Sequence, residues 1–126
     1  MDIEIYLPWP PTVNDYYGTR VVKKRQIRYI KAKGRKFRED IEAAVAEQVG
    51  YLHLDDRLFV EVELFPPDDR RRDVDNYMKA LLDAMTQAKI WEDDSQIDQL
   101  FIYRGVKCRG GKVVVKIGMA GPVLQT

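Results

Sequence analysis

Apolar and polar side chains alternate along two stretches of the chain, as they do in a strand that buries one face. These stretches cover residues 3–7 and 58–65, and each stops at a proline. Two further apolar stretches, 97–106 and 112–119, are joined by a segment that contains glycine. We expect four strands from this pattern, with the last two paired as a hairpin.

A helical repeat of apolar residues occupies two other stretches. One runs from about Lys33 to a stop at Gly50, and the other covers residues 74–88. The apolar stripe of the second consists of Val74, Tyr77, Met78, Leu81, Leu82 and Met85. The element order β-α-β-α-β-β predicts an α+β fold with two helices packed on a mixed β-sheet. We expect a single domain over residues 1–126.

The composition is typical of a globular protein, because 45% of the 126 residues are hydrophobic and 33% are charged, with both signs present. The one cysteine, Cys108, cannot form an internal disulfide. No apolar run approaches the roughly 18 residues of a membrane span, and the N-terminus lacks a signal-peptide pattern. We therefore expect a cytoplasmic location and no membrane partner.

Basic residues are concentrated in one stretch although the net charge is only +1. Ten of the 21 lysines and arginines lie between Arg20 and Arg38, with no acidic residue between Asp15 and Glu39. Such a stretch suits DNA phosphates, although a basic loop can also be solvated without a ligand. We expect a basic loop that continues into the first helix. The DNA-binding candidates are Lys23, Lys24, Arg25, Arg28, Lys31 and Arg35.

Three tyrosines flank or interrupt this basic stretch: Tyr16, Tyr17 and Tyr29. Aromatic rings among basic residues can stack on unpaired bases of nucleic acid. They can equally anchor a loop by packing, and the residues alone leave both interpretations open.

Residues 68–79 combine carboxylates, three consecutive arginines, a carboxamide and an amine at the start of the second predicted helix. Asp73 and Asp75 lie where loop becomes helix, so a bend in the backbone can bring both to one point. Carboxylate oxygens are hard ligands of the kind that Mg²⁺ prefers. Either aspartate could instead cap the helix, whose first turn favours negative charge. The acidic segment 91–95 could supply a further carboxylate.

The single histidine, His53, and the single cysteine exclude several other kinds of site. A Ser-His-Asp or Cys-His triad would have to use that histidine, and a zinc site of histidine and cysteine has too few ligands. Residues 73–76 lack the glycine and the distal glutamate of a calcium-binding EF-hand. Two separated carboxylates could serve glycoside hydrolysis, but that chemistry has no use for the arginines.

Six short runs follow one another along nearly the whole chain: LPWPPTVN at 7–14, RRRDVDN at 70–76, KA at 79–80, DA at 83–84, WEDDSQ at 91–96 and GGK at 110–112. Together they resemble the RusA family of Holliday-junction resolvases. The resemblance implies a Mg²⁺-dependent, structure-specific endodeoxyribonuclease that makes paired symmetric cuts. It also implies four-way junctions and other branched DNA as substrates, with Mn²⁺ able to replace Mg²⁺. The number of ions per site, one or two, is left open.

The resemblance further implies roles for individual residues. The metal-binding and catalytic carboxylates are those of Asp73, Asp75 and Asp94. The catalytic amine is that of Lys79. The supporting residues are Asn76, Arg72 and Asp93, and Arg70, Arg71 and Arg72 are expected to grip phosphates.

A homodimer is also implied by the resemblance, because two-fold symmetry supplies two identical sites for two cuts. Candidates for its interface are Trp9, Phe59 and Phe65. The competing interpretation is a DNA-binding protein of recombination or replication that does not cut, and whose acidic cluster only caps a helix.

Overall fold

A four-stranded mixed sheet forms the centre of the computed structural model, which describes residues 2–121. Its strands lie in the order β1 (Ile3–Leu7), β6 (Lys112–Met119), β4 (Leu58–Phe65) and β5 (Ile97–Arg104). β6 is antiparallel to both β1 and β4, whereas β5 is parallel to β4. The alternation in β4 buries Leu58, Val60, Val62 and Leu64. These strands begin and end close to the predicted residues.

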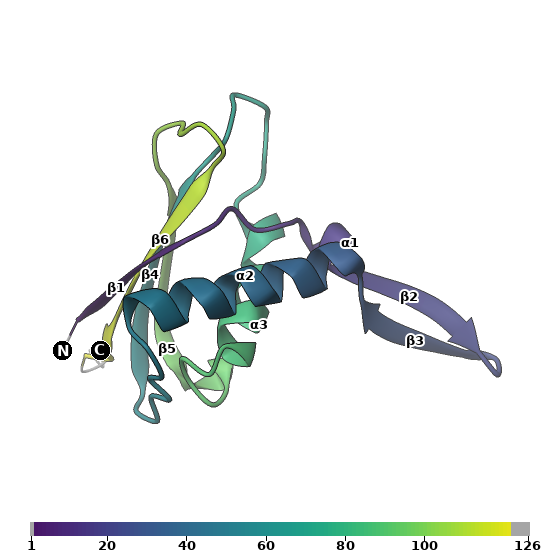
Figure 1. Ribbon diagram of the computed structural model, residues 1–126, viewed down its shortest axis with the longest axis horizontal. Helices are drawn as coiled ribbons and strands as arrows, with labels where there is room; N and C mark the ends of the chain where they lie inside the picture. The colour runs from purple at the N-terminus through teal and green to yellow at the C-terminus, as the bar shows by residue number, and fades with distance from the viewer. Residues whose placement is uncertain (1, 122–126) are drawn as a thin grey trace, which may run out of the picture.

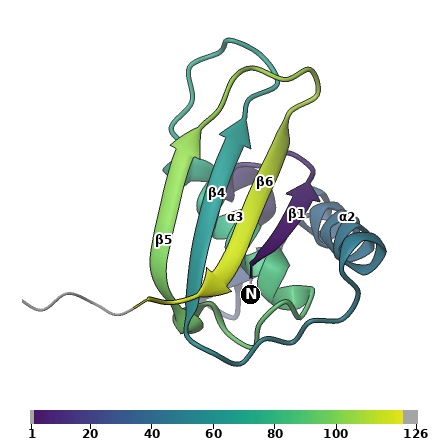
Figure 2. The same cartoon turned by 90° about the vertical axis from the view of Figure 1, so that its left-hand side faces the viewer.

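Two long helices lie against one face of this sheet: α2 (Ala32–Gln48) and α3 (Asp75–Gln87). Figure 2 views the sheet from the face that these helices leave uncovered. The shorter helices are α1 (Val13–Tyr16) and η1 (Asp94–Gln96). The α+β fold with two helices packed on a mixed sheet is therefore confirmed. Within residues 2–121, no helix is both long enough and apolar enough to cross a membrane.

The predicted hairpin of the last two strands is wrong, because β4 lies between β5 and β6. The connection between them crosses the end of β4, where the N–H of Gly105 donates to the carbonyl of Leu64 at 2.8 Å. The N–H of Cys108 likewise donates to the carbonyl of Pro66 at 2.8 Å. A connection of this length can span one intervening strand, and β4 gains a hydrogen-bonded neighbour on both edges.

The predicted basic loop is also wrong, because most of it forms a second, two-stranded sheet. Strands β2 (Tyr17–Val22) and β3 (Arg25–Ile30) pair antiparallel around Lys23 and Lys24. Both lysines have positive φ, 50° and 63°, as a two-residue hairpin turn of type I′ requires. Lysine is not typical of such turns, so the sequence carries no clear turn signal. The hairpin projects away from the four-stranded sheet (Figure 1).

Candidate functional site

The segment that links β4 to α3 ends at the two aspartates predicted to bind metal. Asp73 precedes Val74, which is the N-cap residue, and Asp75 is the first residue of α3. The helix has no side-chain hydrogen bond at its cap, and the N–H of Asn76 donates to the backbone carbonyl of Asp73 at 3.2 Å. Neither aspartate therefore forms a side-chain cap, although Asp75 lies in the first turn, where negative charge is favoured.

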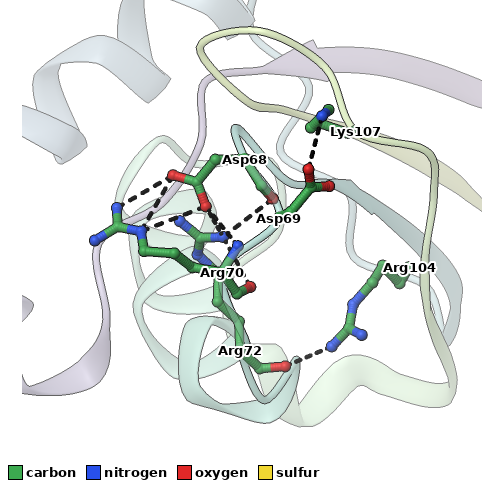
Figure 3. A network of polar contacts seen from close by, with 6 residues as sticks. All are labelled: Asp68, Asp69, Arg70, Arg72, Arg104 and Lys107. Atoms are coloured by element: carbon green, nitrogen blue, oxygen red, sulfur yellow. Dashed lines mark hydrogen bonds and ion pairs between the residues drawn. The ribbon is translucent and has the colours of Figure 1, made fainter.

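Four aspartates of this stretch fall into two groups. Asp68 accepts from the Arg72 guanidinium at 2.7 Å, and Asp69 from the Lys107 ammonium at 2.8 Å (Figure 3). Hydrogen bonds from Arg72 and from the N–H of Arg70 hold the pKa of Asp68 well below its usual range. By contrast, Asp73 and Asp75 are exposed, and within residues 2–121 neither carboxylate has a hydrogen bond or ion pair. These two carboxylates remain available to a cation.

The three consecutive arginines differ in exposure and in ion pairing. The Arg72 side chain is only 11% exposed, pairs with Asp68, and lies 5.8 Å from the centre of the Trp9 ring. Arg70 also pairs with Asp68, at 3.2 Å, whereas Arg71 is exposed. All three line a groove of about 820 Å³. Arg72 is therefore held in place by the protein itself, while Arg70 and Arg71 border open space.

One flank of α3 continues the site beyond Asp75. Lys79 follows one helical turn later, is exposed, and holds its ammonium 5.5 Å from the centre of the Tyr17 ring. Asn76 is also exposed. A further turn along lies Asp83, which pairs with Arg38 of α2 at 2.7 Å. The role of Asp83 was missed from the sequence, where this residue stood only in the run DA at 83–84 that contributes to the family resemblance.

Asp93 and Asp94 lie at the start of η1. The carboxylate of Asp93 accepts from the N–H of Ser95 at 2.9 Å, within a capping box that also involves Gln96. Partial burial of the Asp94 carboxyl raises its pKa, and the neighbouring Asp93 and the charge of Asp83 add to this effect. Asp94 therefore sits near the Asp83 end of α3, in an acidic environment.

Asp73, Asp75 and Asp94 are not gathered into one cluster in this structure. Among the residues it describes, no three carboxylate, histidine or cysteine side chains approach closely enough to hold one metal ion. Their shared metal-binding role stays a prediction.

The predicted DNA-binding residues lie on the β2–β3 hairpin and at the start of α2. Lys23, Lys24, Arg25 and Arg28 belong to the hairpin and are exposed. Lys31 instead donates to the backbone carbonyl of Asn14, and Arg35 to that of Ile30, both at 2.7 Å. In the part of the chain that the structure describes, these four hairpin cations have no hydrogen bond or ion pair from their side chains, whereas the two at the base have a role in local structure.

The three tyrosines also separate into different environments. Tyr16 is wholly buried and cannot stack on a base. Tyr17 is half-buried, with the Arg28 guanidinium 3.6 Å from its ring centre. Only Tyr29, 39% exposed, presents its ring toward solvent.

Comparison with known proteins adds a family context to this geometry. The family described as endodeoxyribonuclease RusA matches residues 8–118. The chain is 37% identical over 116 residues to the crossover junction endodeoxyribonuclease rusA of Enterobacteria phage HK97, covering 92% of this chain and 93% of that protein. It is 32% identical over 117 residues to the crossover junction endodeoxyribonuclease RusA of Escherichia coli strain K12, covering 93% and 94%. The same values hold for the rusA protein of Enterobacteria phage 82.

Proposed function

Because this chain belongs to the RusA family of crossover junction endodeoxyribonucleases, we propose that it resolves Holliday junctions by paired symmetric cuts that require Mg²⁺. One observation carries the site assignment. Asp73 and Asp75 present carboxylates without partners in the described residues, and Asp75 lies one helical turn before the exposed ammonium of Lys79. A metal-dependent phosphodiester hydrolase needs an acidic site for the cation, and a positive charge near the reacting phosphate stabilises its transition state.

The donor set fits a hard divalent cation. Carboxylate oxygens are the protein ligands that Mg²⁺ prefers, and it retains waters that a phosphate oxygen can replace. Asp73 and Asp75 would hold the ion together with Asp94, and Mn²⁺ would suit the same ligands. When bound, the ion supplies an activated water and neutralises charge on the scissile phosphate.

The side chains around the aspartates bind and orient the DNA. The ammonium of Lys79 stabilises negative charge that develops on the phosphate or on the leaving oxygen. Arg70 and Arg71 border the groove beside α3 and contact flanking phosphates. Asn76 supports the substrate from the first turn of the helix, while Arg72 keeps the loop in shape through Asp68. The cations of the hairpin hold the backbone of a neighbouring arm.

Two symmetric cuts call for two copies of this site, and a homodimer provides them. An aromatic pair supports an interface on the uncovered face of the sheet. It consists of Phe59 and Phe101, whose ring centres lie 5.4 Å apart. Phe65 is on the same strand, β4, with the same orientation. Trp9 is a weaker candidate, because it packs against Tyr77 at 5.0 Å and against Gly111.

Incubation of the protein with a synthetic four-way junction and with linear duplex, in Mg²⁺ or in EDTA, tests this function. We expect symmetric nicks in the four-way junction when Mg²⁺ is present, and no nicks in EDTA. Junction binding without nicks under any divalent ion would favour the competing function, a DNA-binding protein that does not cut.

A further inference from the structure

Three residues from three different elements form a polar cluster outside the predicted metal-binding set. Tyr16 is the last residue of α1, Arg38 lies on α2, and Asp83 lies on α3. The Arg38 guanidinium donates to the Tyr16 hydroxyl at 2.6 Å and to the Asp83 carboxylate at 2.7 Å. The Tyr16 hydroxyl donates to the same carboxylate. The elements are thus joined at one point, which we call the Tyr16 cluster.

The Tyr16 cluster is partly shielded from water, which limits the competition of water for its hydrogen bonds. The Tyr16 residue is wholly buried, and the side chains of Arg38 and Asp83 are 28% and 27% exposed. Burial, together with the hydrogen bond to Asp83, raises the pKa of Tyr16, so its hydroxyl keeps its proton and remains a donor. Hydrogen bonds to a charged group are stronger than neutral ones.

Tyr16 also closes the base of the β2–β3 hairpin. Its backbone carbonyl accepts from the N–H of Lys31, which follows β3, at 2.9 Å. Gly34 of α2 packs against the same carbonyl, and a Cβ atom there would lie only 2.7 Å from the oxygen. Both ends of the hairpin therefore meet at Tyr16.

The contacts continue from Tyr16 to the predicted catalytic lysine. The ring of Tyr17, the first residue of β2, lies 4.6 Å from the Tyr16 ring in an edge arrangement. The same Tyr17 ring contacts the Lys79 ammonium of α3. Asp83 lies one turn beyond Lys79. The hairpin base and the flank of α3 that bears Lys79 are thus connected through packed side chains.

We propose that Tyr16, Arg38 and Asp83 are positioning residues for DNA cleavage, which fix the base of the β2–β3 hairpin against α3. A phosphate backbone held by the hairpin then meets Lys79 at a set distance and angle. This inference rests on the proposed nuclease function. Small errors in the placement of a substrate cost reaction rate while leaving most binding contacts intact.

The substitution Tyr16→Phe tests the inference, because it removes one hydroxyl and keeps the buried ring. We expect the single-turnover cleavage rate of bound junction to fall about tenfold, because both charge-assisted hydrogen bonds of this hydroxyl are lost, the one from Arg38 and the one to Asp83. The junction Kd should stay within about twofold, since the cations of the hairpin are unchanged. Tyr51→Phe is the matched control, because Tyr51 is 75% exposed and outside the cluster.

Hydrogen exchange gives a readout that does not depend on cleavage. In Tyr16→Phe we expect faster exchange of the β2 and β3 amides and unchanged exchange in β4. An unchanged cleavage rate and unchanged exchange would overturn the inference. So would equal acceleration of exchange in β4, because the cluster would then serve only global stability. If the unsubstituted protein does not cleave, the proposed function fails, while the exchange data still decide whether the cluster holds the hairpin.

Discussion

The segment from the end of β4 to the first residue of α3 contains two pairs of aspartates that differ in their surroundings. Asp68 and Asp69 are each paired with a cation, whereas Asp73 and Asp75 have no such partner in the part of the chain described by the structure. All four lie within a few residues of the arginine triplet. Proximity in sequence therefore does not decide which carboxylates are neutralised and which remain available to a metal ion.

Local backbone geometry explains why Asp68 is paired, and a contact with a distant connection explains why Asp69 is paired. The N–H of Arg70 donates to the Asp68 carboxylate at 2.9 Å, which closes a turn over two residues. That turn brings the guanidinium groups of Arg70 and Arg72 back to the same carboxylate. Lys107 reaches Asp69 from the distant connection between β5 and β6. Arg70 and Arg72 are thus paired with Asp68 and not with Asp73.

Removal of one of the unpaired carboxylates, that of Asp73 or Asp75, tests this comparison. It should give the largest effect on cleavage. We expect Asp75→Asn or Asp73→Asn to lower the cleavage rate in Mg²⁺ by at least about 10³-fold, because a metal ligand is lost. Junction binding should persist or strengthen, since negative charge near phosphate is removed. Single-turnover cleavage and a gel-shift titration measure both quantities. Activity within about tenfold of the unsubstituted protein would contradict the metal-binding assignment.

Lys79 gives the next largest effect, because it is the cation beside the unpaired aspartates. We expect Lys79→Ala to reduce the cleavage rate of bound junction by roughly 10²-fold to 10³-fold with little change in Kd. Lys79→Arg, which keeps the charge but changes its shape, should retain more activity. Equal losses in rate and in binding would assign Lys79 to DNA binding instead.

The two lysines of the hairpin turn provide a third test. They contrast with Arg72, whose guanidinium is already paired with Asp68. We expect the double substitution Lys23→Ala/Lys24→Ala to weaken junction binding and to reduce the slope of log K against log salt by about two for each bound protomer. The cleavage rate at saturating protein should change little. Binding measured at several salt concentrations checks this, and an unchanged slope would exclude the turn from the interface.

Substitution of an aspartate that is already paired, Asp68, should give the smallest effect on cleavage. We expect Asp68→Asn to alter the rate less than about threefold, because this carboxylate already has its cations. Its effect is on stability, and it depends on pH. The pKa of Asp68 is lowered by folding, so its contribution is present above its ordinary value of 3.8 and is lost as the pH falls through the lower, folded value.

Thermal denaturation across pH checks the stability effect of Asp68→Asn. The difference in Tm from the unsubstituted protein should be constant from about pH 5 to 8 and should shrink below about pH 4. A difference that grows on acidification would contradict the pairing. Asp69→Asn is the control, because the Asp69 side chain is 83% exposed and its ion pair should contribute little.

Local periodicity in the sequence was sufficient to predict β1, β4, α2 and α3, because each depends on residues two to four positions apart. The acidic stretch could be located because its charged residues lie close together in the sequence, and the role of Lys79 came from the resemblance to the RusA family. The β2–β3 hairpin could not be predicted, because its turn uses two lysines with positive φ in place of the usual turn residues.

The sequence by itself determined where most helices and strands lie and which chemical groups gather at the start of α3. Tertiary structure alone decided the insertion of β4 between β5 and β6, and the meeting of Tyr16, Arg38 and Asp83. Tyr16 and Asp83 are 67 residues apart, and Arg38 and Asp83 are 45 apart. Contacts at such separations depend on how whole elements pack, which no local pattern of side chains specifies.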